Sequence, residues 1–581
     1  MPESFEVVIV GSGVAGALLA NELSAHPAKP RVLILEAGNN AIDDGDRKRF
    51  VDLYGLAVDR DSVSPYIRLA STRESPHPSG GVDRRHLVSL GPDDFKSNYA
   101  RLVGGSTWAW RGNVPRMTPA DFELRDRYHV ADNWPISYAD LLPHYVEAEK
   151  QLGVAGDTSE WDSARQGERG APYPMPPIPQ ALGDQKFRER LRKSAKDGVP
   201  KVDGQGIRVV ATPQARVSTE SYTVPGTTFA RRRCEGNANC IPICPTGAKY
   251  DASVHLRLAL QKKTVTLRSS CPVTRVRTAD DGRVLGVSYR DLKRGAKQDT
   301  DVDAKIVVLA ANAIETPRLW LYSKLRNDND LVGRYLMDHL QNEAVCFMPE
   351  PIYPFRGPQN TSSIPSFLDH PKRDKFSAFN VSIGNDGWGR FVDENGKSKA
   401  PFNILDELLW DSQNRKIAAF GKELQRLLAD DDRSVLTRGL RLSFSTEQLP
   451  EHGNRVRLSE AKDALGIPRP ALEYRVDDYS KESLENARRV CREIIRTAGL
   501  TPEGPDDIQM EYAGAGHLMG TCRMGTEPAK SVVDPYGRAH AHPNLWVVGS
   551  SVFVTGSAAN PTLTLSALTL RSAKEMAKVF A

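Results

Sequence analysis

The hydrophobic pattern at the start of the chain predicts a strand, a helix and a second strand. Residues 7–10 form an uninterrupted apolar run, which is typical of a strand buried on both faces of a parallel sheet. Residues 17–25 place apolar side chains three and four positions apart, as a helix does. A second apolar run over 32–35 follows. The pattern therefore indicates the first unit of an α/β domain.

The glycines inside this unit point to a bound dinucleotide. Gly11 permits a tight turn, Gly13 lets a pyrophosphate approach the backbone, and Gly16 lets the helix pack closely on the strand. Glu36 ends the second strand, where its carboxylate can accept hydrogen bonds from ribose hydroxyls. That carboxylate would repel the 2′-phosphate of NADP. The unit alone leaves NAD and FAD open.

The last forty residues repeat these signals. Residues 545–548 form another buried-strand run, followed at once by Gly549. From Asn560 onwards the apolar spacing is helical, with Pro561 near the first turn. A strand, a glycine turn and a helix at this end suggest that both ends of the chain complete one nucleotide-binding fold.

Length and composition fit a globular protein of two or three domains. The chain has 581 residues, of which 40% are hydrophobic and 26% charged. A net charge of +5 gives no reason to expect a nucleic-acid partner. The first residues lack the pattern of a signal peptide, and no apolar run reaches the length of a membrane-spanning helix.

Three of the seven cysteines, Cys234, Cys240 and Cys244, lie within eleven residues, whereas the others are scattered singly. This distribution argues against a disulfide framework. Thiolates are the ligands that zinc and iron–sulfur clusters select. Structural zinc needs a fourth ligand and none lies nearby, whereas a three-iron cluster needs three cysteines. A cluster, a zinc site and a redox-inactive loop all remain open on spacing alone.

Several long segments resemble the glucose–methanol–choline (GMC) oxidoreductases, flavoproteins that oxidise alcohols. They include "ARLVGGSTWAWRGNVPRMTPADFEL", "KIVVLAANAIETPRLWLYS", "GHLMGTCRMG" and "AANPTLTLSALTLR", in the family's order. The resemblance implies an α/β (α+β overall) fold, with a Rossmann-like FAD-binding domain and a substrate domain built on an antiparallel sheet. The expected FAD-binding domain comprises 1–118, 201–330 and 505–581, with a Cys-rich loop at 231–252. The expected substrate domain comprises 119–200 and 331–504.

The resemblance also implies which residues contact FAD. In "VGGSTWAWRGNV", Gly104, Gly105 and Ser106 would lie along the isoalloxazine, and Asn113 would contact the ring. Some relatives link FAD covalently to a histidine in this loop, where this chain has Trp108, so FAD is expected to be non-covalent. The other implied contacts are Val273 with adenine, and Gly549 and Ser550 with the diphosphate.

Two polar residues near the C-terminus resemble the family's catalytic pair. His517, in "GHLMGTCRMG", would accept the hydroxyl proton as a hydride leaves the substrate carbon for the flavin. Asn560 would hydrogen-bond the same oxygen and orient it. His540 and His542, in "RAHAHPN", are interpreted instead as residues of a surface loop.

The stretch "CEGNANCIPICPTGAKYDA" resembles the insertion of iron–sulfur-bearing GMC dehydrogenases, including the catalytic subunit of bacterial FAD-dependent glucose dehydrogenase. In those enzymes the matching cysteines hold a [3Fe-4S] cluster. Close relatives can carry two adjacent cysteines first, where this chain has Cys234-Glu235. The resemblance implies a sugar or polyol dehydrogenase that passes electrons through the cluster to a cytochrome or another acceptor.

The resemblance to these dehydrogenases also implies a small signal-bearing partner subunit and a periplasmic or membrane-associated location, with a cytoplasmic location as the alternative. One alternative function is a soluble sugar (pyranose-type) oxidase that uses oxygen, in which the Cys loop is only structural. Another is a flavin-bearing binding subunit without turnover.

Overall fold

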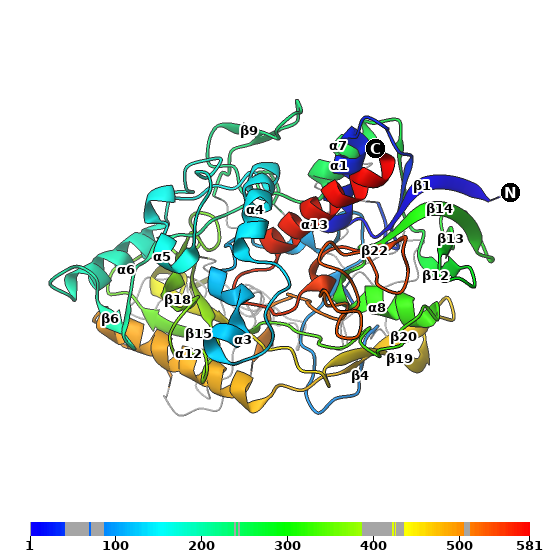
Figure 1. Ribbon diagram of the computed structural model, residues 1–581. Helices are drawn as coiled ribbons and strands as arrows, with labels where there is room; N and C mark the ends of the chain where they lie inside the picture. The colour runs from blue at the N-terminus through cyan, green and yellow to red at the C-terminus, as the bar shows by residue number, and fades with distance from the viewer. Residues whose placement is uncertain are drawn as a thin grey trace.

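The structure is a computed structural model that describes residues 2–40, 69–70, 86–236, 240–241, 244–385, 421–422, 425, 435–504 and 512–581. Two large sheets organise these residues, with helices packed around them (Figure 1). The combination confirms the predicted α/β fold class.

The first sheet has seven strands in the order β11-β2-β1-β14-β13-β12, with β22 also paired to β14. Its strands are β1 (Glu3–Val10), β2 (Val32–Leu35), β11 (Val265–Arg268), β12 (Val273–Thr278), β13 (Val284–Tyr289), β14 (Thr300–Leu309) and β22 (Leu545–Val547). β11, β2, β1, β14 and β22 are parallel, whereas β12, β13 and β14 pair antiparallel. The parallel part carries the apolar runs, as strands covered on both faces require.

The two ends of the chain meet beside this sheet. Helix α1 (Val14–Ala25) packs against α13 (Thr562–Ala577) and α7 (Ser253–Leu260), and α13 also packs against α4 (Tyr138–Leu152). Figure 1 shows the C-terminal helix α13 beside α1. The C-terminal residues therefore complete the layer that the N-terminal residues begin.

The second sheet has six strands in the order β21-β15-β18-β17-β16-β8. Its strands are β8 (Val210–Ala211), β15 (Leu340–Phe347), β16 (Ser362–Ile364), β17 (Phe379–Gly384), β18 (Gly439–Thr446) and β21 (Ala513–Gly514). All its pairs are antiparallel, and α12 (Asp478–Thr497) packs on β15 and β18. Strand β21 at the edge of this sheet ends three residues before His517, and β15 beside it begins directly after His339.

Shorter elements lie outside the two large sheets, and some of their strands form small sheets of two or three strands. The remaining strands are β3 (Leu69–Ala70), β4 (Val88–Ser89), β5 (Tyr99–Ala100), β6 (Lys201–Val202), β7 (Gln205–Gly206), β9 (Ser221–Thr223), β10 (Ala230–Arg232), β19 (Arg455–Lys462) and β20 (Pro468–Glu473). The remaining α-helices are α3 (Leu124–Tyr128), α5 (Ser163–Gln166), α6 (Leu182–Lys193), α8 (Asn312–Tyr322) and α11 (Val435–Arg438). The 3-10 helices are η1 (Gly105–Ala109), η2 (Pro119–Phe122), η3 (Thr158–Glu160), η4 (Pro365–Phe367), η5 (Ser550–Val552) and η6 (Lys578–Phe580).

Two hydrophobic cores correspond to the two sheets. Ile34 and Val308 lie in the first core, and Phe444 and Ile494 lie in the second. Helix α4 contributes Tyr145 to the first core, although its residues fall in the range predicted for the substrate domain. The domain boundaries stay a prediction. Among the described residues, no helix is both long enough and apolar enough to cross a membrane.

Candidate active site

The glycine turn after β1 leaves open space in front of α1. Gly11 has a φ of 101°, and an added Cβ there would lie 2.7 Å from the carbonyl oxygen of Ala310. A Cβ on Gly16 would overlap the Gly11 carbonyl oxygen, so this contact also requires glycine. A Cβ on Gly13, in contrast, would meet no atom of the described residues within 4 Å. Since no side chain caps α1, its first N–H groups suit an anion at Gly13.

Glu36 is buried at the end of β2 and faces this turn. Its Oε2 accepts hydrogen bonds from the Ser12 N–H (3.0 Å) and the Ser12 hydroxyl (2.6 Å), and its Oε1 accepts from the Gly38 N–H (2.9 Å). Burial raises the pKa of Glu36, whereas these three hydrogen bonds act to lower it. The Cys271 N–H donates to the Glu36 carbonyl at 2.8 Å, and half-buried Val273 begins β12 two residues later. The structure thus brings the predicted ribose contact beside the glycine turn.

The loop around η1 crosses the same turn. The Gly104 N–H donates to the Ser12 hydroxyl oxygen at 3.2 Å, and a Cβ on Gly105 would lie 3.2 Å from the Cα of Gly13. Both glycines have positive φ, 93° and 58°. Ser106 is exposed, and its hydroxyl oxygen accepts from the Ala100 N–H at 3.0 Å. The predicted flavin loop therefore lies directly on the predicted phosphate loop.

Residues from the C-terminal segment close the other side. Gly549 has a φ of 96°, and an added Cβ would lie 3.5 Å from the Cβ of Ala15. The Ser550 hydroxyl donates to the Leu518 carbonyl at 2.5 Å. Asn113 is buried, and its Oδ1 has no hydrogen-bond partner among the described residues. An unpaired buried amide oxygen and an open glycine turn fit a dinucleotide cofactor held by these segments.

His517 and Asn560 lie side by side, although 43 residues separate them in the sequence. The Nδ2 of Asn560 is 3.1 Å from the Nε2 of His517. On its other side, the Nδ1 of His517 is 2.8 Å from the Nδ1 of His339, with the two rings nearly perpendicular at 81°. Burial, followed by the neighbouring His339, lowers the pKa of His517 well below its ordinary value. His517 is therefore neutral at pH 7 and able to accept a proton.

Asp338 and His339 are site residues that the sequence patterns did not indicate. The Oδ1 of Asp338 accepts from the backbone N–H groups of His517 (2.9 Å) and His339 (2.8 Å), and the Ser97 hydroxyl donates to its Oδ2. Burial raises the pKa of Asp338 to about 6 and lowers that of His339 to about 4. The sequence around them, a pair of polar residues before the mixed strand β15, carries no distinctive signal.

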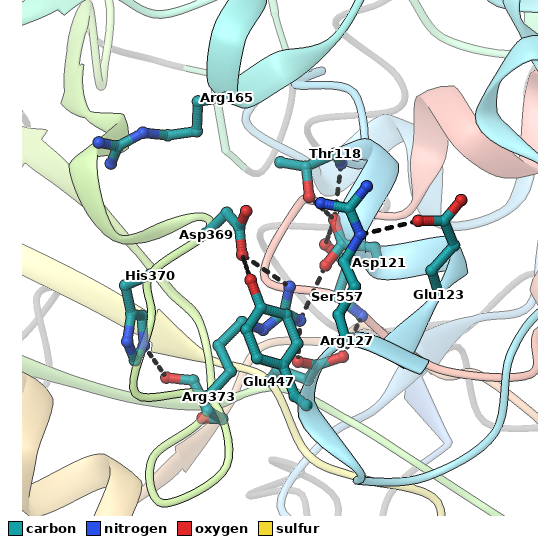
Figure 2. Close-up of polar contacts among 12 residues, drawn as sticks. Thr118, Asp121, Glu123, Arg127, Arg165, Asp369, His370, Arg373, Glu447 and Ser557 are labelled. Atoms are coloured by element: carbon teal, nitrogen blue, oxygen red, sulfur yellow. Dashed lines mark hydrogen bonds and ion pairs between the residues drawn. The ribbon is translucent and has the colours of Figure 1, made fainter. Parts of the chain in front are cut away.

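A buried ion cluster holds the loop that carries Asn560 (Figure 2). Ser557 has a φ of 55°, its N–H donates to Glu447 Oε1 at 2.9 Å, and its hydroxyl donates to Asp121 Oδ2 at 2.9 Å. Arg373 bridges the two carboxylates, with Nη2 donating to Asp121 at 2.9 Å and to Glu447 at 2.6 Å. These ion pairs raise the pKa of Arg373 above its usual value, although burial opposes them. The cluster thus fixes a backbone conformation that is costly for a serine.

Comparison with known proteins identifies the family. Sequence models described as GMC oxidoreductase match residues 221–341 and 450–569. The chain is 32% identical to the fructose dehydrogenase large subunit of Gluconobacter japonicus, over 98% of this chain and 97% of that protein. The chain belongs to the GMC oxidoreductase family. The resemblance seen in the sequence is thereby confirmed, and this GMC oxidoreductase is an enzyme that acts on CH–OH groups of sugars or alcohols.

Other relatives of this GMC oxidoreductase include oxidases and a solved structure. The paromamine 6′-oxidase of Streptomyces fradiae is 27% identical over 99% of this chain and 91% of that protein. The structure of pyridoxine 4-oxidase from Mesorbium loti matches with a TM-score of 0.63, 20% identity and 98% coverage of each chain. The likeness to pyridoxine 4-oxidase concerns the fold alone. Because GMC oxidoreductases bind FAD, the cofactor is FAD rather than NAD.

The Cys-rich loop lies next to the flavin loop. Lys249 is buried, and its Nζ donates to the carbonyls of Cys240 (2.8 Å), Trp108 (2.7 Å) and Trp110 (2.6 Å). Cys234, Cys240 and Cys244 form no disulfide among the described residues. Within the described part of the chain, which leaves out 237–239 and 242–243 of this loop, no three His, Cys, Asp or Glu residues converge as metal ligands.

The interpretation of His542 as part of a surface loop was wrong. Its side chain is buried, its Nδ1 donates to the Gly282 carbonyl at 2.6 Å, and its Nε2 accepts from the Arg326 N–H at 3.0 Å. The ring also packs against Trp320, with the ring centroids 5.6 Å apart. His540 is half-buried, with its Nε2 2.9 Å from the Ser531 hydroxyl. The apolar run that follows forms β22 and pairs with β14, so the segment before it also packs against the fold, which a local count of polar residues does not reveal.

Proposed function

We propose that this GMC oxidoreductase is an FAD-dependent dehydrogenase of a sugar or a related alcohol. The observation that carries the proposal is the contact between neutral His517 and Asn560 beside segments that fit FAD. The 32% identity to a fructose dehydrogenase large subunit supports a sugar as substrate. D-Fructose is therefore the first compound to test.

The reaction divides between the cofactor and the two side chains. FAD supplies the hydride acceptor when it is bound. His517 takes the proton of the substrate hydroxyl at Nε2, and the Asn560 amide donates to the same oxygen and fixes its direction. Burial favours this role, because a desolvated histidine stays neutral until the substrate proton arrives.

The residues predicted to contact FAD keep that role in the proposal. Gly13 and the first turn of α1 would receive the pyrophosphate, and Glu36 would exchange its bonds to Ser12 for the ribose hydroxyls. The remaining proposed contacts are Gly11, Gly16, Gly104, Gly105, Ser106, Asn113, Val273, Gly549 and Ser550. FAD is proposed to be non-covalent, because the loop has Trp108 and no histidine, and the Trp108 Nε1 donates to the Val103 carbonyl at 2.8 Å.

We further propose that Cys234, Cys240 and Cys244 hold a [3Fe-4S] cluster. Three thiols without a fourth nearby ligand suit such a cluster, and Lys249 ties their loop to the flavin loop. The alternative is a soluble sugar (pyranose-type) oxidase in which the Cys loop is structural. The similarity to paromamine 6′-oxidase favours that alternative.

An anaerobic flavin-reduction screen tests the proposed activity. D-Fructose, D-glucose, a methyl glycoside and sorbitol are mixed with the FAD-loaded enzyme, and the flavin absorbance is followed. His517→Ala should slow bleaching by about 10²- to 10⁴-fold, the usual contribution of a general base. His452→Ala is the matched control, because His452 is exposed. A flavin that none of these compounds bleaches would refute the proposal.

Metal and acceptor analysis tests the cluster. Protein purified without oxygen should contain about three iron atoms per chain, with matching sulfide. Cys244→Ser should lower the iron content, whereas Cys491→Ser, at a buried single thiol, should not. Zinc without iron would mean a zinc-stapled loop. Oxygen consumption at the rate of flavin reduction, without iron, would establish the oxidase alternative.

The partners and location follow from the same proposal. A small signal-bearing subunit and a cytochrome would place the enzyme in the periplasm or at the membrane, with a cytoplasmic location as the alternative. The relative's description as a large subunit supports an assembly of several chains. Fractionation of native cells tests both the location and the assembly. Recovery of all the activity from the cytoplasm, in an enzyme made of this chain alone, would rule out the assembly.

A further inference from the structure

A chain of hydrogen bonds begins and ends on the same short loop, 556–560. At one end, the Nε2 of His339 is 3.3 Å from the Gly556 carbonyl oxygen. In the middle, the Nδ1 atoms of His339 and His517 are 2.8 Å apart. At the other end, the Nε2 of His517 is 3.1 Å from the Nδ2 of Asn560. One backbone segment therefore sets both ends of a chain that passes through two imidazole rings.

The direction of every bond in this chain follows from its Gly556 end. A carbonyl oxygen only accepts, so the Nε2 of His339 carries the hydrogen. A neutral imidazole has one N–H, and buried His339 has a pKa of about 4, so its Nδ1 is an acceptor. The hydrogen between the two Nδ1 atoms therefore belongs to His517. The Nε2 of His517 is left with a lone pair, to which the Asn560 amide donates.

We propose that His339 is a positioning residue: it accepts the Nδ1–H of His517 and so holds the tautomer whose Nε2 receives the substrate proton. This inference rests on the proposed function of His517 as the base. With the other tautomer, His517 would present an N–H to the substrate hydroxyl and could not accept its proton. His339 lies 178 residues from His517 in the sequence and meets it only through the fold.

A neutral partner differs from the carboxylate that often orients a histidine. A carboxylate beside Nδ1–H favours the imidazolium and raises the pKa of the ring. Here Asp338, the nearby carboxylate, accepts the backbone N–H groups of His517 and His339 instead. His339 thus fixes the tautomer of His517 without adding negative charge at its ring.

The loop at the two ends of the chain is itself held in place. Ser557 follows Gly556 directly, and Asp121 and Glu447 bind its hydroxyl and its N–H (Figure 2). Arg373 fixes both carboxylates in turn. A shift of this loop would move Gly556 and Asn560 together, so the alignment of both rings depends on it.

Three substitutions at position 339 separate the two contacts of the ring. His339→Asn places an amide near the position of Nδ1 and keeps an acceptor for His517. His339→Gln places its amide near the position of Nε2, and so keeps the bond to Gly556 but loses the acceptor. His339→Phe keeps the ring shape and loses both contacts. Melting temperature and FAD content confirm that each variant is folded and loaded.

The first measurement is ¹⁵N NMR of histidine-labelled enzyme without substrate. His517, assigned by the loss of its signals in His517→Ala, should carry its hydrogen on Nδ1 in the wild type and His339→Asn. It should lose that preference in His339→Gln and His339→Phe. A wild-type His517 that carries its hydrogen on Nε2 would overturn the proposal, whatever the substrate is.

The second measurement is the rate of anaerobic flavin reduction by D-fructose or whichever compound of the screen reduces it. His339→Asn should retain the rate within about 10-fold, and His339→Gln and His339→Phe should lose about 10²-fold or more, with little change in KM. Equal rates in all three variants would refute a role through the tautomer. If no compound reduces the wild-type flavin, the proposed function fails, while the NMR result still decides the role of His339.

Discussion

Removing Arg373 should destabilise the protein because two carboxylates would remain buried without a positive counter-charge. Arg373, Asp121 and Glu447 are each no more than 1% exposed, and the Arg373 Nη2 lies 2.9 Å and 2.6 Å from the two carboxylates. Breaking a buried ion pair from one side typically costs about 3–5 kcal/mol. Because two carboxylates lose their counter-charge, the loss of stability in Arg373→Met should lie at the upper end of this range, at about 5 kcal/mol.

Urea unfolding of FAD-loaded protein, followed by near-ultraviolet circular dichroism at pH 7.5, measures this loss. Arg127→Met is a matched control, because Arg127 pairs with Glu123 at the surface and both side chains are nearly half exposed (Figure 2). A surface pair of this kind contributes about 0.5 kcal/mol or less. Both variants remove the same guanidinium, so the difference between their losses of stability reports the effect of burial.

Two further results check the physical reason. Adding Asp121→Asn and Glu447→Gln to Arg373→Met should recover more than half of the loss, because the buried groups are then neutral. Burial already raises the pKa of Glu447, and removing Arg373 raises it further. The difference between wild type and Arg373→Met should therefore shrink as the pH falls from 7.5 to 5, because the Glu447 carboxyl takes up a proton more readily in the variant. A loss below about 1 kcal/mol, or a triple variant no more stable than the single one, would refute the reasoning.

Three other predictions concern the cofactor, the Cys loop and the base. Gly11→Ala should lower both the melting temperature and the FAD content, because the Gly11 φ of 101° disfavours a side chain. Gly13→Ala should lower the FAD content alone, because an added Cβ there meets no atom of the described residues within 4 Å but occupies the space proposed for the pyrophosphate. Lys249→Met should leave three carbonyls without their donor and destabilise the fold by about 3 kcal/mol in urea unfolding; an unchanged midpoint would contradict this. The kcat/KM of flavin reduction should stay nearly constant from pH 8 to pH 7, because the pKa of His517 is well below its ordinary value, and should fall only about two-fold at pH 6, where Asp338, with a pKa of about 6, is half protonated. A base with an ordinary histidine pKa would lose about four-fold by pH 6.

The part of the fold that the sequence predicted is the part with local signals. The apolar runs over 7–10, 32–35 and 545–548 each became strands of one sheet, because a strand covered on both faces must be apolar throughout. Gly11 and Gly16 were predictable because close backbone contacts at these positions exclude a side chain. The long match to one family supplied the rest of the prediction, including the antiparallel sheet.

The residues that sequence analysis missed act through contacts between distant segments. Asp338 and His339 become site residues only because β15 pairs with β21, which brings position 339 beside position 517. Arg373 belongs to a stretch without a clear periodic pattern, and its partners Asp121 and Glu447 lie 252 and 74 residues away. Local residue spacing could not have indicated the His339–His517 contact or the Arg373 cluster, because it does not show which distant segments come together.

The meeting of both chain ends beside one sheet has a consequence for biosynthesis. Strand β1 is synthesised long before β22, Asn560 and α13. A nascent polypeptide therefore lacks the strand that pairs with β14, the oriented amide and the covering helix until these late segments have been made. Products that stop before β22 should therefore neither close this sheet nor complete the catalytic pair.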